Sequence, residues 1–215
     1  FFTFSCSSTK DHLSDLNIKS SKKTIELSSV DNKAGKILSE DEKALKKIAD
    51  NWREFFHYTP LPKEKLQIQA QVETLKESQN SKKLIEKALA ELTLGKYTDA
   101  DLTLAKLAKI DSKNVDGLLA MTILAQKKNQ LSTAFNLLRD IKNLVEKGSD
   151  VDDAFLTRYR YVLATTQLQK GNKEAGRSTL RSLIIHDHSF IAGYITLANT
   201  YMTEDKVPLA EFIIR

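Results

Sequence analysis

The sequence holds few of the residue combinations that carry out chemistry. The pattern Gly-x-Ser-x-Gly, which exposes a nucleophilic serine, is absent, and Gly95-Lys96 lacks the upstream glycine of a phosphate-binding loop. The histidines cluster at one place, His186-Asp187-His188. On a helix, residues two apart point in different directions, so this cluster fits a polar helix end better than a metal site. The sequence therefore predicts no catalytic, cofactor or metal site.

The single cysteine carries the one distinct chemical prediction. Cys6 follows the apolar segment Phe1-Phe-Thr-Phe and the small residue Ser5, an order that resembles the end of a bacterial lipoprotein signal peptide. The resemblance implies that Cys6 is lipidated, which would anchor the protein to a membrane of the bacterial cell envelope, facing the periplasm. The alternative is an ordinary free cysteine in a cytoplasmic protein. The Ser- and Lys-rich residues 7–36 lack the apolar side chains for a core, so we expect a flexible tether over residues 1–36.

Composition indicates a predominantly helical, soluble chain. Of 215 residues, 41% are hydrophobic and 28% charged, with seven Gly, three Pro and one Cys. So few turn formers do not suit the frequent turns of a β-sandwich or barrel, and no apolar run reaches the ~18 residues of a membrane-spanning helix. The net charge of +5 is spread over many lysines rather than gathered in a stripe. We therefore expect no nucleic-acid partner, and nothing predicts a small-molecule substrate.

Residues 37–80 predict a divergent helical hairpin. Ser39 and Glu42 have the spacing of a capping box, and the apolar residues that follow recur every three or four positions, on one helix face. That face consists of Leu45, Ile48, Ala49, Trp52, Phe55 and Phe56. Prolines 60 and 62 end this helix. Residues 65–75 fit helix and strand spacing alike, but their Gln, Glu, Lys and Ala favour a second helix.

Small residues recur in pairs from residue 81 onward. The two members of each pair are twelve residues apart, and successive pairs are 34 residues apart, except for one spacing of 42. The pairs are Ala88 and Ala100, Thr122 and Ala134, Ala164 and Gly176, and Ala198 and Ala210. Two helices pack closely only where neither projects a large side chain. Each pair therefore predicts a hairpin of two helices.

These hairpins resemble the tetratricopeptide repeat family, whose unit is a 34-residue helix-turn-helix. The large residues that open the first helices would be Leu84, Leu118 and Tyr194, with Arg160 departing from the pattern. The turn glycines would be Gly95 and Gly171, with Asn129 and Asp205 substituting, and the usual proline after the second helix is missing. The resemblance implies an all-α, right-handed superhelix with repeats at 81–114, 115–148, 149–190 and 191–215.

The one long spacing, 42 residues, exceeds the period by eight. Because Gly148 marks the turn between the two units, we expect the insertion to lengthen the helix on each side by about one turn. The longer pair would project from an edge of the stack. This projection would either contact a partner or merely fill space within the stack.

In the tetratricopeptide family, the first helices of the hairpins line a concave face that holds partner peptides or helices. The resemblance places six residues of this chain on that face: Ile85, Leu119, Tyr161, Thr165, Ile195 and Asn199. Only Asn199 matches the Lys, Arg and Asn that some members use to bind a terminal carboxylate. We therefore expect a groove with an apolar floor, suited to an apolar helix or extended segment. The alternative is that several of these positions, with Leu89 and Ile123, belong to the core between hairpins.

The sequence thus favours a non-enzymatic scaffold or adaptor that binds proteins, tethered through Cys6 and supporting assembly of a bacterial envelope complex. Further repeats or a partner should follow Arg215, because a solenoid exposes the apolar face of its last unit. Two other hypotheses stay open. The segment is either the regulatory docking arm of a larger enzyme or signalling protein, or a soluble cytoplasmic adaptor.

Overall fold

The computed structural model describes residues 60–75 and 78–215. The chain divides into two units, residues 1–36 and 37–215, and every described residue belongs to the second. The predictions for Cys6, for the tether, and for the helix with Trp52, Phe55 and Phe56 lie outside the described residues.

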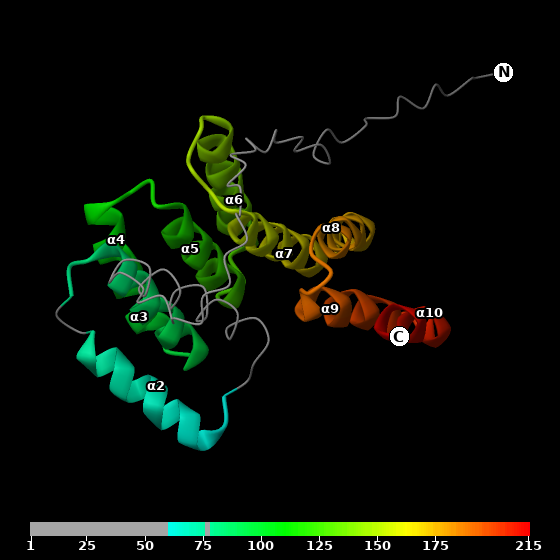
Figure 1. The fold of residues 1–215 in the computed structure, drawn as a ribbon, viewed down its shortest axis with the longest axis horizontal. Coiled ribbons are helices and arrows are strands. Elements are labelled where there is room, and N and C mark those ends of the chain that lie inside the picture. The colour runs from blue at the N-terminus through cyan, green and yellow to red at the C-terminus, as the bar shows by residue number, and fades with distance from the viewer. Residues whose placement is uncertain (1–59, 76–77) are drawn as a thin grey trace, which may run out of the picture. The chain divides into compact units, whose positions relative to one another are not determined.

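The described residues form helices joined by short turns, and no strand occurs among them. The helices are α2 (Pro62–Thr74), α3 (Ser81–Thr93), α4 (Tyr97–Ile110), α5 (Val115–Lys127), α6 (Leu131–Glu146), α7 (Asp153–Gln169), α8 (Lys173–His186), α9 (Ile191–Met202) and α10 (Val207–Ile214). We number the hairpins 1 to 4: α3–α4, α5–α6, α7–α8 and α9–α10. Each second helix packs on the next first helix, and α5 also contacts both α3 and α7 (Figure 1).

The eight small residues sit where the two helices of each hairpin approach, as predicted. None of their side chains is appreciably exposed. At Gly176 the approach is so close that an added Cβ would lie 2.6 Å from the Cδ2 atom of Leu168. A larger residue there would require the side chain of Leu168 to move out of the helix crossing.

The turns within the hairpins also follow the prediction. Gly95 and Gly171 have φ values of +73° and +89°, and Asn129 and Asp205 adopt φ values of 57° and 56°. Glycine enters this left-handed region freely, and Asn and Asp tolerate it better than other residues. In each turn the following residue donates its N–H to a carbonyl near the end of the preceding helix, as Lys96 does to Glu91 at 2.8 Å. The substitutions at 129 and 205 therefore keep the turn.

The eight-residue insertion lengthens both flanking helices and the turn between them. α7 has 17 residues against 13 in α5, and α6 has 16 against 14 in α4. The connection between α6 and α7, residues 147–152, is two residues longer than those at 111–114 and 187–190. The predicted full turn is therefore present in α7, and about half a turn in α6. Projection toward a partner stays a prediction.

The helix predicted for residues 65–75 is confirmed as α2. Pro62 occupies its first turn, where the missing proline N–H would have no helical partner in any case. Among the helical residues of α2 only Val72 is buried, and the next buried residue is Leu75. The amide of Gln71 donates a hydrogen bond to the carboxylate of Glu86 on α3. α2 thus joins hairpin 1 through a small contact that is partly polar.

Candidate protein-interaction surface

Two of the six predicted groove residues are core residues. Ile85 is 3% exposed and Leu119 is fully buried. Both lie on first helices that are covered by the next first helix, since α3 contacts α5 and α5 contacts α7. The alternative interpretation is confirmed for Leu89 and Ile123 as well, which are both buried. A partner therefore cannot use these four positions without opening the stack.

Tyr161 joins hairpin 3 to hairpin 4. Its hydroxyl shares a hydrogen bond of 3.0 Å with the hydroxyl of Thr196 on α9, and its ring packs edge-on against Phe190 at 5.2 Å between centroids. Burial raises the pKa of the Tyr161 phenol, because the charged phenolate would lose its hydration. The resemblance placed Tyr161 on the concave face, where its hydroxyl would meet a partner or solvent. It finds its partner within the chain.

Thr165 belongs to a polar contact between hairpins 2 and 3. The amide of Gln126 on α5 donates to the hydroxyl of Thr165 at 3.0 Å and to that of Thr166 at 2.6 Å. It also lies 3.0 Å from the carbonyl of Val162. Nothing in the spacing of Gln126 distinguishes it from a surface glutamine, so sequence reasoning missed it.

Ile195 and Asn199 differ from the other four groove residues because both are exposed, Ile195 to 51%. They lie on α9, in the last hairpin, where no following hairpin is described. Of the twelve large hydrophobic side chains that are exposed among the described residues, seven belong to this hairpin. They are Ile191, Ile195, Met202, Val207, Leu209, Phe212 and Ile214. The accessible apolar surface is therefore concentrated at hairpin 4.

The repeat spacing shows why part of this surface is open. Ile214 occupies the position of Leu104, Leu138 and Leu180 in the earlier hairpins, and those leucines are at most 2% exposed whereas Ile214 is 66% exposed. Ile195 likewise corresponds to the covered residues Ile85, Leu119 and Tyr161. We call the residues Ile195, Asn199, Met202 and Ile214 the open face of hairpin 4. It is the surface that the next hairpin covers elsewhere in the chain.

A charged network ties hairpin 4 to α8. Arg177 on α8 is 2% exposed, donates to the carbonyl of Thr200 at 2.7 Å and lies over the ring of Tyr201. The same guanidinium pairs with the carboxylate of Glu204 at 2.8 Å. Hydrogen bonds from Arg177, Lys206 and Lys173 lower the pKa of Glu204 to about 2. The open face thus belongs to a hairpin that polar contacts fix to α8.

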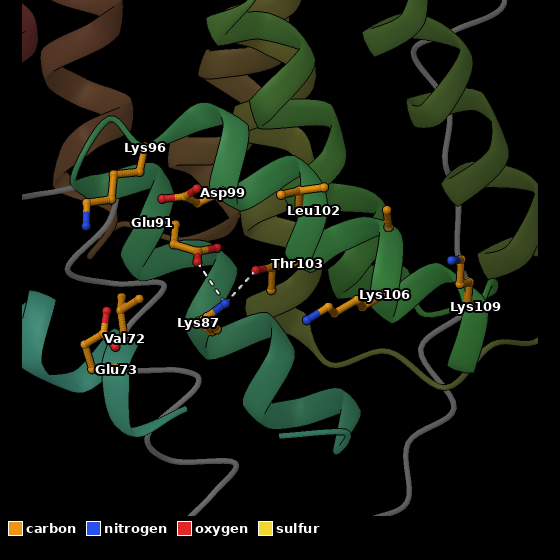
Figure 2. A pocket seen from close by; sticks show the side chains of 11 residues that line it. Val72, Glu73, Lys87, Glu91, Lys96, Asp99, Leu102, Thr103, Lys106 and Lys109 are labelled. Atoms are coloured by element: carbon orange, nitrogen blue, oxygen red, sulfur yellow. Dashed lines mark hydrogen bonds and ion pairs between the residues drawn. The ribbon is translucent and has the colours of Figure 1, made fainter. Parts of the chain in front are cut away.

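A second surface lies among α2, α3 and α4. It is a cleft of about 460 Å³. Its lining includes Val72 and Glu73 of α2, Lys87 and Glu91 of α3, Lys96 in the turn, and Asp99, Leu102, Thr103, Ala105, Lys106 and Lys109 of α4 (Figure 2). The ammonium group of Lys87 pairs with Glu91 at 3.0 Å and donates to the hydroxyl of Thr103 at 3.1 Å. We call Lys87, Glu91 and Thr103 the polar floor of the cleft.

The described residues hold no group of three or more side chains suited to a metal ion. At the histidine cluster α8 ends at His186, and the carboxylate of Asp187 caps the following turn by accepting from the N–H and hydroxyl of Ser189. None of the helices between residues 60 and 215 that the structure describes is both long and apolar enough to cross a membrane.

Comparison with known proteins supports the fold. No protein-family model matches the sequence, and no curated protein matches it. Among solved structures, MamA 41-end from Desulfovibrio magneticus RS-1 matches with a TM-score of 0.51 and 16% identity, over 78% of this chain and 91% of that chain. The fold is of the tetratricopeptide type. A MamA RS-1 ArsTM double mutant aligns with a TM-score of 0.49 at 16% identity, over 78% of this chain and 90% of its own.

Proposed function

We propose that this chain is a protein-interaction scaffold without catalytic activity of its own, and that its main docking site is the open face of hairpin 4. The observation that carries the proposal is the exposure of Ile195, Met202 and Ile214, which are 51%, 48% and 66% exposed. Large contiguous apolar surfaces are uncommon on monomeric proteins and mark sites of association.

The occupant that fits this face is an amphipathic helix, supplied by a partner protein or by a further repeat after Arg215. The chain itself covers the equivalent surfaces of hairpins 1, 2 and 3 with its own helices, because each hairpin packs on the next. A partner helix would use the same ridges and grooves, with its apolar face on Ile195 and Ile214. Asn199 lies within the open face and would hydrogen-bond the polar side of that helix.

The docking site can be tested by changing two exposed residues. Ile195→Asp with Ile214→Asp places two charges on the open face while leaving the core intact, so the helical content should not change. We expect proteins that the wild-type chain captures from its native organism to be lost from the variant in a quantitative pull-down. Each captured candidate would then be reduced to a helical peptide and titrated against the purified chain.

The matched control is Leu66→Asp with Ile185→Asp. These side chains are 69% and 72% exposed and lie outside hairpin 4, on α2 and α8. The control should capture the same proteins as the wild type. Equal loss of partners from both variants, or retention by both, would contradict docking at hairpin 4.

The further proposal is that the scaffold is a lipoprotein, tethered through Cys6 to a membrane of the bacterial cell envelope, where it supports assembly of an envelope complex in the periplasm. Its support is the sequence around Cys6. Replacing Cys6 with Ser should release the protein from the membrane fraction of its native organism. Sedimentation of the Cys6→Ser variant with membranes would count against the anchor, and a soluble cytoplasmic wild type would favour the cytoplasmic adaptor. An enzyme domain in the same polypeptide would favour the docking arm.

A further inference from the structure

We propose that the cleft among α2, α3 and α4 is a second binding site, which takes an extended acidic segment of a partner protein. The proposal depends on the proposed scaffold function in one respect, that the ligand is a segment of a protein. It is otherwise independent, because the cleft shares no residue with the open face of hairpin 4. Its volume of about 460 Å³ lies within the usual range of ligand pockets, roughly 300–1,000 Å³.

Outside the pair of Lys87 and Glu91, the lining of the cleft holds three lysines and two carboxylates, Glu73 and Asp99, and the lysines give it a net positive charge. Lys96, Lys106 and Lys109 form the rim of the cleft, and their ammonium groups have no ion-pair partner among residues 60–75 and 78–215. Figure 2 shows Lys106 and Lys109 along the length of α4 and Lys96 at the turn that precedes it. Carboxylates spaced along an extended chain would pair with these lysines in turn.

The floor of the cleft has an unused acceptor. Glu91 is 2% exposed, and its Oε2 atom is buried without a hydrogen-bond partner among the described residues. A buried acceptor left without a hydrogen bond is unfavourable, because it has lost its hydration without a replacement. An extended peptide brings backbone N–H groups as well as carboxylates. A ligand of this class therefore offers acceptors to the lysines and backbone donors that reach Glu91 once its side chain turns toward the cleft.

The rest of the chain provides an internal control, since the fold does not require a charged floor. In hairpins 2, 3 and 4 the position of Lys87 holds an apolar residue, and the position of Glu91 holds no charged one. The residues at the position of Lys87 are Met121, Leu163 and Leu197, and those at the position of Glu91 are Ala125, Gln167 and Tyr201. The same helical hairpin forms each time. The ion pair is thus a feature of this cleft, as expected if the cleft has a binding role.

An apolar wall completes the site. Leu102 on α4 is 62% exposed within the cleft, and Val72 and Ala105 also line it. A ligand that alternates acidic and apolar side chains would place carboxylates toward the lysines and an apolar residue against Leu102, because successive side chains of an extended peptide point to opposite sides. We therefore infer an acidic segment that also contains large apolar residues.

The test uses the full 215-residue chain and three fluorescein-labelled ten-residue peptides. In the first peptide glutamate alternates with leucine and glycine, and in the other two every glutamate is replaced by glutamine or by lysine. Fluorescence anisotropy should show binding of the glutamate peptide, and affinity should fall as salt is raised. Lys106→Glu with Lys109→Glu should weaken this binding at least tenfold. Ala105→Trp should weaken it similarly by filling the cleft without changing the charge.

The matched control is Lys127→Glu with Lys147→Glu, two exposed lysines outside the cleft. This variant has the same net charge as the rim variant and should bind within twofold of the wild type, with unchanged helical content in all variants. Equal losses in both charge variants, full affinity in Ala105→Trp, or equal binding of the glutamine peptide would overturn the proposal. Ile195→Asp with Ile214→Asp should bind the glutamate peptide normally, which separates this site from the docking site of hairpin 4.

Discussion

Hairpins 1 and 4 have the same backbone plan but opposite chemistry at equivalent positions. Lys87 and Glu91 form an ion pair on α3, with Glu91 2% exposed, where Leu197 and Tyr201 occupy the matching positions of α9. Both hairpins keep small residues at their helix crossing. The crossing and the turn therefore define the hairpin, whereas the face turned toward a neighbouring element is free to be charged or apolar.

The difference also separates two kinds of interface. At hairpin 4 most of the exposed large side chains are apolar, and its buried charge lies in the network around Arg177 and Glu204. At hairpin 1 charge lies inside the contact between helices and lines an open cleft. An apolar face suits a helix that buries it, whereas a charged cleft suits a ligand that brings complementary charge.

The largest effect should come from breaking the ion pair of hairpin 1. Glu91→Ala leaves the ammonium group of Lys87 in a largely buried place with only Thr103 as its partner. Removing one partner of a buried pair is strongly destabilising, and we expect a loss of about 3 kcal/mol in the free energy of unfolding. Urea denaturation followed by circular dichroism measures this loss.

The control replaces both charges with the residues of hairpin 2. Lys87→Met with Glu91→Ala reproduces Met121 and Ala125, and it should return stability to within about 1 kcal/mol of the wild type, because no unpaired charge remains. If Glu91→Ala alone were as stable as this double variant, the ion pair of Lys87 and Glu91 would not contribute to the free energy of unfolding. Hairpins 1 and 4 would then differ at these positions in composition only.

A smaller effect should distinguish equivalent positions in hairpins 3 and 4. Tyr161 and Ile195 share one repeat position, but Tyr161 is packed against Phe190 and bonded to Thr196, whereas Ile195 is 51% exposed. We expect Tyr161→Ala to lower the free energy of unfolding by about 2 kcal/mol and Ile195→Ala to change it by less than about 0.5 kcal/mol. Similar losses for both, in thermal and urea unfolding, would show that coverage by the next hairpin is not what separates them.

Much of the fold was predictable because it depends on local rules. Small residues at a fixed spacing identify the helix crossings, and a residue that tolerates positive φ identifies each turn, even where Asn129 or Asp205 replaces glycine. The lengthened α7 followed from the eight-residue excess. These features act within one hairpin, so the sequence contains them directly.

The candidate site was harder to predict because it depends on contacts between hairpins. Tyr161 and Thr165 were expected in a groove, but their polar atoms pair with Thr196 and Gln126 across the hairpin boundary. Ile85 and Leu119 were assigned by repeat position alone, which does not show whether the next helix covers them. The cleft has no repeat signal of its own, because one of its walls comes from α2, before the first 34-residue unit. The sequence signal that points to it is the charged pair Lys87 and Glu91, where the later repeats hold no charge.

The smallest effect should appear only in acid, at the network of hairpin 4. The pKa of Glu204 falls from 4.5 to about 2 in the folded protein, so its carboxylate contributes stability that is complete above about pH 4.5 and is lost as the pH falls toward 2. The difference in unfolding temperature between the wild type and Glu204→Gln should therefore be constant from pH 7 to pH 5 and shrink below pH 4.5. Glu211→Gln, whose carboxylate is exposed and 3.6 Å from Arg215, should show no comparable change. If the difference in unfolding temperature for Glu204→Gln persisted unchanged to pH 2, the charge of Glu204 would not contribute to the stability of hairpin 4. Arg177 would then hold the hairpin without its carboxylate partner, and hairpin 4 would depend on charge even less than its contrast with hairpin 1 indicates.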